Sequence, residues 1–195
     1  MPMVERSRPE IDVDALKTRL AVWQTPQAMR AEVDDIRSAT LFNRGGLAFL
    51  RDAWIAAEFG AIRKAEEVRI VSDAWPDFEL RLDGCDEKFE AVEAIDPERR
   101  RGDEYREGRP KVMEDWLARV EQAPEWLRDA CRKKAGKGYD NRTKSVSLVI
   151  YFNFSEFGMR QSEFETCFPS ATIAVKDVFK SVWILWKNKA YRIWS

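Results

Sequence analysis

The dipeptide Asp83-Gly84 is the strongest local structural signal in the chain, because it predicts a tight turn between two strands. It lies inside the stretch PDFELRLDGCDEKFEAVEA, residues 76–94. A two-residue type I′ turn needs positive φ at both central residues, and Asp-Gly is a favoured pair for this geometry. Apolar and polar residues alternate in the flanking segments. The stretch therefore predicts an antiparallel hairpin with one apolar and one polar face.

The position of the turn determines which residues of the hairpin face each other. Phe78 is expected opposite Phe89, and Asp77 opposite Glu90. The apolar face holds Phe78, Leu80, Leu82 and Phe89, and the polar face holds Asp77, Glu79, Arg81, Asp86, Lys88 and Glu90. Two pairs on the polar face join opposite charges, namely Arg81 with Asp86 and Glu79 with Lys88. A longer turn with a shifted register would instead place Asp77 opposite Glu93.

The pair formed by Asp77 and Glu90 joins two negative charges. Like charges directly opposite each other destabilise a sheet. A hard divalent cation removes this repulsion, and Mg²⁺ typically takes one or two carboxylates together with water and substrate phosphate. The alternatives are one protonated carboxyl group or two fully exposed carboxylates. We expect Asp77 and Glu90 to hold Mg²⁺ or Mn²⁺, with Glu79 as a further metal ligand and Glu93 as a reserve.

The charges around the hairpin are unevenly distributed, although the whole chain is nearly neutral. The net charge of the 195 residues is −1, so no global attraction to nucleic acid is expected. Residues 73–98 carry ten acidic and two basic side chains, whereas residues 128–144 carry seven basic and two acidic ones. An acidic centre flanked by basic segments suits a site that holds a metal ion and contacts a polyanion backbone.

The residue types that are rare or absent narrow the chemistry further. The sequence has no histidine, which excludes Ser-His and Cys-His nucleophilic pairs and histidine bases. Cys85, Cys131 and Cys167 are far apart and odd in number, so neither a disulfide framework nor a zinc cluster is predicted. No apolar run is long enough for a transmembrane helix, and the first residues lack the apolar core of a signal peptide. We expect a cytoplasmic protein without a membrane segment.

The remainder of the chain predicts a sheet with helices packed on it. Helices are expected within 12–24, 26–45, 47–65 and 156–180, and from about 113, with a segment from 126 that extends or follows that helix. Further strands are expected at 68–71, 146–154 and 182–186, with a last strand after Lys187-Asn188-Lys189. The fold class is α/β, with α+β left open: a mixed central β-sheet flanked by helices. We expect a single domain, 1–195, in which an N-terminal helical arm, 1–65, packs on a sheet-containing core, 66–195.

This order of elements and two short motifs resemble the PD-(D/E)XK restriction-endonuclease-like superfamily. Pro76-Asp77 matches the Pro-Asp motif of that family, and FEAVEA, residues 89–94, lies where the family carries its (D/E)XK element. The lysine of the family follows its acid by two positions, but Val92 stands at that position after Glu90. Lys88 precedes Glu90 by two positions, and we expect its ammonium group to substitute for the missing lysine.

The resemblance implies a nuclease that hydrolyses DNA or RNA with a bound divalent cation. Asp77 and Glu90 would hold the cation, and Lys88 would position or stabilise the attacking water. Glu93 is a further candidate catalytic residue. The candidate contacts to nucleic-acid phosphates are Arg99, Arg100 and Arg101.

A second interpretation uses the same sheet without catalysis. The missing lysine and the near-zero net charge favour a regulatory or interaction module that binds a partner protein. No oligomeric state is predicted from the sequence. A homodimer would be indicated if Trp183 and Trp186, which lie in the apolar run VWILW, were exposed in the monomer.

Overall fold

The core of the protein is a six-stranded mixed β-sheet. The computed structural model describes residues 12–36, 47–72, 75–97, 116–137, 141–155, 158 and 160–195. The strands follow one another across the sheet in sequence order: β1 (Glu67–Ile70), β2 (Phe78–Leu82), β3 (Cys85–Ala94), β4 (Val146–Phe152), β5 (Val182–Trp186) and β6 (Lys189–Trp194). Strands β3, β4 and β5 are parallel, whereas the pairs β1–β2, β2–β3 and β5–β6 are antiparallel. The expected α/β class with a mixed central sheet is confirmed.

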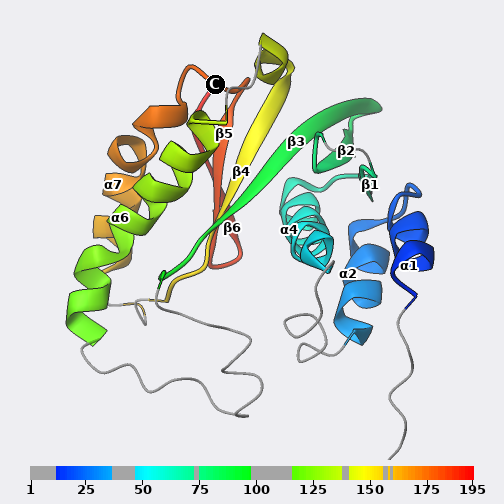
Figure 1. Ribbon diagram of the computed structural model, residues 1–195, viewed down its shortest axis with the longest axis horizontal. Helices are drawn as coiled ribbons and strands as arrows, with labels where there is room; N and C mark the ends of the chain where they lie inside the picture. Colours follow the sequence, from blue (N-terminus) through cyan, green and yellow to red (C-terminus); the bar gives the residue numbers. More distant parts are fainter. Residues whose placement is uncertain are drawn as a thin grey trace, which may run out of the picture.

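Helices cover both faces of this sheet (Figure 1). One face carries α1 (Val13–Leu20), α2 (Pro26–Asp35) and α4 (Ala48–Arg63), and the other carries α6 (Trp116–Ala135) and α7 (Gln161–Ala171). Two short 3₁₀ turns, η1 (Asn141–Ser145) and η2 (Ile173–Val175), lie in the connections. Within the described residues, no helix is sufficiently long and apolar to cross a membrane.

The hairpin formed by β2 and β3 has the register that the Asp-Gly dipeptide predicts. Phe78 pairs with Phe89, and Leu82 pairs with Cys85 next to the turn. Asp83 and Gly84 both have positive φ, 50° and 72°, as a type I′ turn requires. The shifted register that would place Asp77 opposite Glu93 is therefore wrong. The paired segment begins at Phe78, so Asp77 lies at the entrance to β2.

The N-terminal helices begin at residues that favour helix starts. Asp12 caps α1 by accepting hydrogen bonds from the backbone N–H groups of Asp14 and Ala15, and Thr25 caps α2, which starts with Pro26. The sequence predicted that the first helix reaches Gln24, but the helix ends at Leu20. Gln24 instead forms an isolated bridge with Val68 at the edge of the sheet.

The hydrophobic core has two parts, one on each side of the sheet. Phe59 of α4 packs edge-to-face against Phe89 of β3 with ring centroids 5.3 Å apart, which joins α4 to the apolar face of the hairpin. On the other side, Phe168 of α7 packs edge-to-face against Trp186 of β5 at 5.5 Å. Trp186 is only 1% exposed and belongs to this second part, whereas its neighbour Leu185 belongs to the first, so β5 contributes core side chains to both parts.

Candidate functional site

Asp77 is held in place by backbone hydrogen bonds on two sides. Its carbonyl oxygen accepts from the N–H of Val71 at 3.1 Å, and its own N–H donates to the carbonyl oxygen of Phe89 at 3.1 Å. Its carboxylate oxygen Oδ2 accepts from the backbone N–H of Ala91 at 2.7 Å. The carboxylate therefore takes the place that a backbone carbonyl would have if β2 continued beside β3. This arrangement fixes the acid at the point where the β2–β3 ladder ends.

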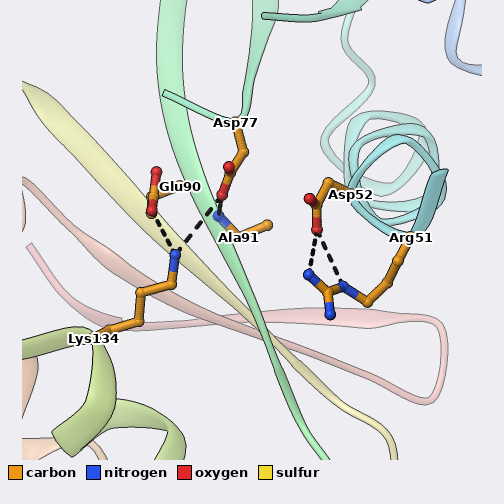
Figure 2. Close-up of polar contacts among 6 residues, drawn as sticks. All are labelled: Arg51, Asp52, Asp77, Glu90, Ala91 and Lys134. Atoms are coloured by element: carbon orange, nitrogen blue, oxygen red, sulfur yellow. Dashed lines mark hydrogen bonds and ion pairs between the residues drawn. The ribbon is translucent and has the colours of Figure 1, made fainter. Parts of the chain in front are cut away.

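Glu90 of β3 and Lys134 of α6 form a buried ion pair next to this carboxylate (Figure 2). Lys134 Nζ lies 2.5 Å from Glu90 Oε1 and 3.8 Å from Asp77 Oδ2. The side chains of Lys134 and Glu90 are 7% and 5% exposed, whereas that of Asp77 is 26% exposed. Asp77 is thus the member of this acid pair that solvent reaches most easily.

The packing of α6 against β3 explains how Lys134 reaches the two acids. A second ion pair joins Arg119 of α6 to Asp96, just beyond the end of β3. Lys134 lies fifteen positions after Arg119, about 22 Å along the helix, and Asp96 lies six positions after Glu90, about 20 Å along the strand. The later helix residue pairs with the earlier strand residue, so the helix runs antiparallel to the strand, and the similar spans allow an ion pair at each end.

The charges around Asp77 alter its proton affinity. Burial raises the pKa of Asp77 most strongly, the Glu90 carboxylate adds to this effect, and the pKa reaches about 6. Lys134 and the hydrogen bond from Ala91 act in the opposite direction. Because the ionised form of such a carboxylate is unfavourable, a nearby cation stabilises that form strongly.

Two further acids lie on the α4 side of the same region. Arg51 of α4 donates from Nε and Nη2 to Asp52 Oδ1 at 3.1 and 3.0 Å (Figure 2). Burial lowers the pKa of Arg51, but Asp52 and, at longer range, Glu93 and Asp77 raise it above its usual value. Asn153 beside the end of β4 donates from Nδ2 to Glu93 Oε1 at 2.7 Å. Asp52 thus contacts Arg51 directly, whereas Glu93 and Asp77 act on Arg51 only through longer-range electrostatics.

Two other residues predicted for the site, Glu79 and Lys88, do not join the acid pair. Glu79 is bound to Arg69 Nη2 at 2.6 Å, so its carboxylate serves an ion pair within the sheet and does not join Asp77. Lys88 pairs across the hairpin with Glu79 and is exposed. The ammonium group beside the acid pair belongs to Lys134 instead of Lys88. The candidate contacts Arg99, Arg100 and Arg101 lie outside the described residues.

Lys134 and Asp52 are the members of the site that the sequence did not indicate. Lys134 belongs to the basic segment 128–144. The charge pattern predicted only that this segment contacts a polyanion, and it did not single out Lys134. Asp52 occurs in a helix whose apolar spacing predicts only a face packed against the hydrophobic core. Nothing in the local sequence of either residue shows that α6 and α4 bring it to β3 from opposite faces of the sheet.

The arrangement offers oxygen ligands to a hard cation. Among the described residues, no cluster of three or more Asp, Glu, Cys or His side chains is close enough to hold a metal ion. A pair of carboxylates is nevertheless a common protein contribution to Mg²⁺, because water and substrate phosphate complete the coordination. Asp77 and Glu90 fit this role by their oxygen chemistry and by the raised pKa of Asp77.

Comparisons with known proteins give no independent identification. The sequence matches no model of a protein family, and the searches of curated proteins and of solved structures find no significant match either. Any statement about activity must therefore come from the site itself.

Proposed function

We propose that the protein is a nuclease-like hydrolase that cleaves phosphodiester bonds of DNA or RNA with Mg²⁺ or Mn²⁺ held by Asp77 and Glu90. The observation that carries this proposal is the convergence of two carboxylates and one ammonium group at the end of the β2–β3 ladder. Such a group combines oxygen ligands for a cation with a fixed positive charge beside them.

The order of elements around the site supports the same proposal. A helix, three antiparallel strands, a second helix and a parallel strand follow one another as α4, β1, β2, β3, α6 and β4. The resemblance to PD-(D/E)XK nucleases rested on this order and on the motifs at Pro76-Asp77 and FEAVEA. The main departure from that pattern is Val92, which stands where the family has its lysine. Lys134 would compensate for it, because its ammonium group lies beside Glu90 and Asp77.

The residues of the chain would have separate roles in this reaction. Asp77 and Glu90 would hold Mg²⁺ or Mn²⁺, which would supply polarisation of the scissile phosphate and a lower pKa for a water molecule. Asp77, the more exposed acid, would face the substrate side, and Glu90 would complete the pair from inside. Lys134 would donate hydrogen bonds to the attacking water or to a phosphate oxygen, because its ammonium group has three donors and two acids nearby orient it.

A second candidate function follows from the same ion pair. Lys134 already neutralises Glu90 at 2.5 Å, and such a contact stabilises the acid without any metal. A protein with this pair and a net charge of −1 fits a non-catalytic module that binds a partner protein on the polar face of the hairpin. This reading requires that no divalent cation binds at Asp77.

The test is a cleavage assay on single-stranded DNA, double-stranded DNA and RNA, each with millimolar Mg²⁺ or Mn²⁺ and with EDTA. The proposal expects metal-dependent shortening of at least one substrate, reduced by about a hundredfold or more in Asp77→Asn, since the ligand charge is essential to the chemistry.

The matched control is Glu79→Gln, which changes a buried acid of the same hairpin that is bound to Arg69. This variant should retain cleavage if it folds. Equal loss in Asp77→Asn and Glu79→Gln, or cleavage that survives in EDTA, would overturn the assignment of the site. The absence of cleavage on every substrate would favour the interaction module.

A further inference from the structure

A cavity of about 350 Å³ opens at the carboxyl ends of β3, β4 and β5. Among the residues that the structure describes, six aromatic side chains line it: Trp54, Trp126, Tyr151, Phe152, Phe154 and Trp186. They come from α4 on one side of the sheet, from α6 on the other, and from the ends of β4 and β5. The carboxyl edge of parallel strands is the usual place for ligands in open α/β sheets.

The aromatic rings of the cavity are held in place by contacts with one another and with the backbone. Trp54 and Tyr151 are half-buried and lie with ring centroids 4.8 Å apart. Trp126 packs edge-to-face against the half-buried Phe154 at 5.5 Å. Trp186 is buried, and its indole N–H donates to the carbonyl oxygen of Phe154 at 2.8 Å. Rings held in this way offer flat, rigid surfaces to another flat ring.

The charged groups of the cavity suit a nucleotide whose base lies inside the cavity and whose phosphate lies at its opening. Two acids among the described lining residues are each bound by an arginine, Glu58 by Arg30 and Asp96 by Arg119. Lys187 also lines the cavity, at the turn between β5 and β6, with its ammonium group 4.9 Å from the ring centre of Trp186. The cavity therefore combines stacking surfaces, paired acids and one cation at the turn.

One hydrogen bond links the cavity to β3, the strand that carries Glu90. Asn153 in its wall is the residue that donates to Glu93 at 2.7 Å. Glu93 lies three residues after Glu90 on β3, a distance of about 10 Å along the strand. Asp96 in the cavity wall lies about 20 Å from Glu90 along the same segment, a distance that about six nucleotides stacked at 3.4 Å each would span. One nucleic-acid strand can thus lie across both places.

A base can enter such a cavity only when it is unstacked. An aromatic cavity at the end of a sheet can contact the flat face of an unpaired base, whereas a duplex presents its bases paired and stacked. Single strands avoid the cost of unstacking a duplex, and stacking on aromatic side chains is the usual source of their affinity. Since the net charge of the chain is −1, electrostatic attraction alone would give little binding, and stacking would have to supply it.

The geometry points to a nucleobase-binding subsite in this cavity, which makes single-stranded nucleic acid the substrate class of the protein. This inference rests on the proposed nuclease function and extends it. One base of the strand stacks against Trp54 and Phe154, and Lys187 contacts the adjoining phosphate. The backbone then continues along Asn153 towards Asp77 and Glu90.

The experiment measures binding without catalysis. Fluorescently labelled oligo(dT) and oligo(U) of twelve nucleotides are titrated with the full chain in EDTA at low salt, and anisotropy is recorded. We expect at least one of them to bind, and a duplex of the same length to bind at least about tenfold more weakly. Trp54→Leu and Phe154→Leu should each weaken binding by about tenfold or more, as the loss of one stacking surface does.

Two controls separate base stacking from other effects. Trp23→Leu alters a tryptophan that lies between Arg69 and Arg81, remote from the cavity, and should leave the affinity unchanged. A strand of the same length without bases should bind weakly to the wild type and equally weakly to Trp54→Leu. If this strand binds as tightly as oligo(dT), or if Trp54→Leu weakens both strands equally, the subsite does not exist.

A mononucleotide separates two sources of the same chemistry. Thymidine or uridine monophosphate should compete far more weakly than the twelve-nucleotide strand, because it lacks the adjoining backbone. Competition at equal concentration would identify a free-nucleotide site and contradict the inference. The binding assay contains EDTA, so its result does not depend on a metal ion. Normal binding in this assay, together with no metal-dependent cleavage in the separate cleavage assay, would reject the nuclease and keep the subsite. Cleavage unaffected by Trp54→Leu would reject only the subsite.

Discussion

Lys134 Nζ lies 2.5 Å from Glu90 Oε1 and 3.8 Å from Asp77 Oδ2, so one ammonium group serves two acids unequally. Glu90 is nearly neutralised by this contact. Asp77 is farther from the cation, more exposed, and has a pKa raised to about 6 by burial and by Glu90. The two acids should therefore respond differently when their charges are removed.

Replacing Lys134 tests the buried ion pair. Lys134→Met keeps the length of the side chain but removes the charge, and leaves the buried Glu90 carboxylate beside Asp77. We expect a loss of about 3–5 kcal/mol in the free energy of unfolding, as is typical when one partner of a buried pair is removed. Urea denaturation of the variant measures this change.

The neighbouring lysine provides the control. Lys133 is exposed on the same helix, and Lys133→Met should change the free energy of unfolding by less than about 0.5 kcal/mol. The double variant Lys134→Met with Glu90→Gln should recover part of the loss, because the uncompensated charge is gone. A loss in the double variant equal to the sum of the single losses would show that the pair is not coupled.

The pKa of Asp77 predicts a pH-dependent stability. The folded protein holds the proton of Asp77 up to about pH 6, whereas the unfolded chain releases it near 3.8. Between these values the folded state binds more protons, so Asp77 makes the free energy of unfolding fall as the pH rises. Asp77→Asn should remove this fall and be more stable than wild type above pH 6, by about 1–3 kcal/mol.

Melting curves from pH 4 to pH 7 measure the difference between the two proteins. Asp86→Asn, at the exposed end of the same hairpin, is the control and should show no gain in that window. A difference between Asp77→Asn and wild type that stays constant with pH would contradict the raised pKa.

The hairpin shows how far local sequence reaches. Asp83-Gly84 determines the turn, and the alternating residues then determine the register, so the position of Asp77 near Glu90 could be predicted. The repulsion between the two acids could be predicted in the same way, but the cation that relieves it could not. Lys134 is forty-four residues from Glu90 in sequence, and its approach depends on how α6 packs across β3. That packing is a tertiary property which no local pattern encodes.

The C-terminal strands illustrate the same division. The apolar run VWILW predicted a strand covered on both faces, and β5 is such a strand. Trp186 is buried, and Trp183 packs against Phe59 with ring centroids 5.5 Å apart. The condition under which the two tryptophans would indicate a dimer contact is therefore not met. The aromatic cavity at the strand ends was not predictable, because its walls come from four separate elements.

Removing the last two strands should destroy the fold. Deletion of residues 181–195 removes β5 and β6 and exposes the edge of β4 and both core layers. We expect insoluble protein, or protein without a cooperative thermal transition. A soluble deletion variant that melts cooperatively would show that these strands are not part of the core.

A less drastic change in the same region should have a measurable cost. Trp186→Ala removes a fully buried ring and should lower the free energy of unfolding by about 3–5 kcal/mol. Trp194→Ala removes a half-buried ring next to Lys176. This variant should lower the free energy of unfolding clearly less than Trp186→Ala does. Chemical denaturation of both variants gives the comparison.

The binding of a divalent cation at Asp77 is measured most directly by thermal melting at neutral pH, with and without 10 mM Mg²⁺ or Mn²⁺. For a dissociation constant one hundredth of the metal concentration, the stabilisation is about 2.7 kcal/mol, or about 5–10 °C in a chain of this size. We expect this shift in wild type and in Glu79→Gln, and its loss in Asp77→Asn and Glu90→Gln. We also expect Glu90→Gln, unlike Asp77→Asn, to melt lower than wild type without metal. A wild-type protein with no shift in either metal, or a shift that persists in Asp77→Asn, would contradict the metal site and with it the proposed nuclease.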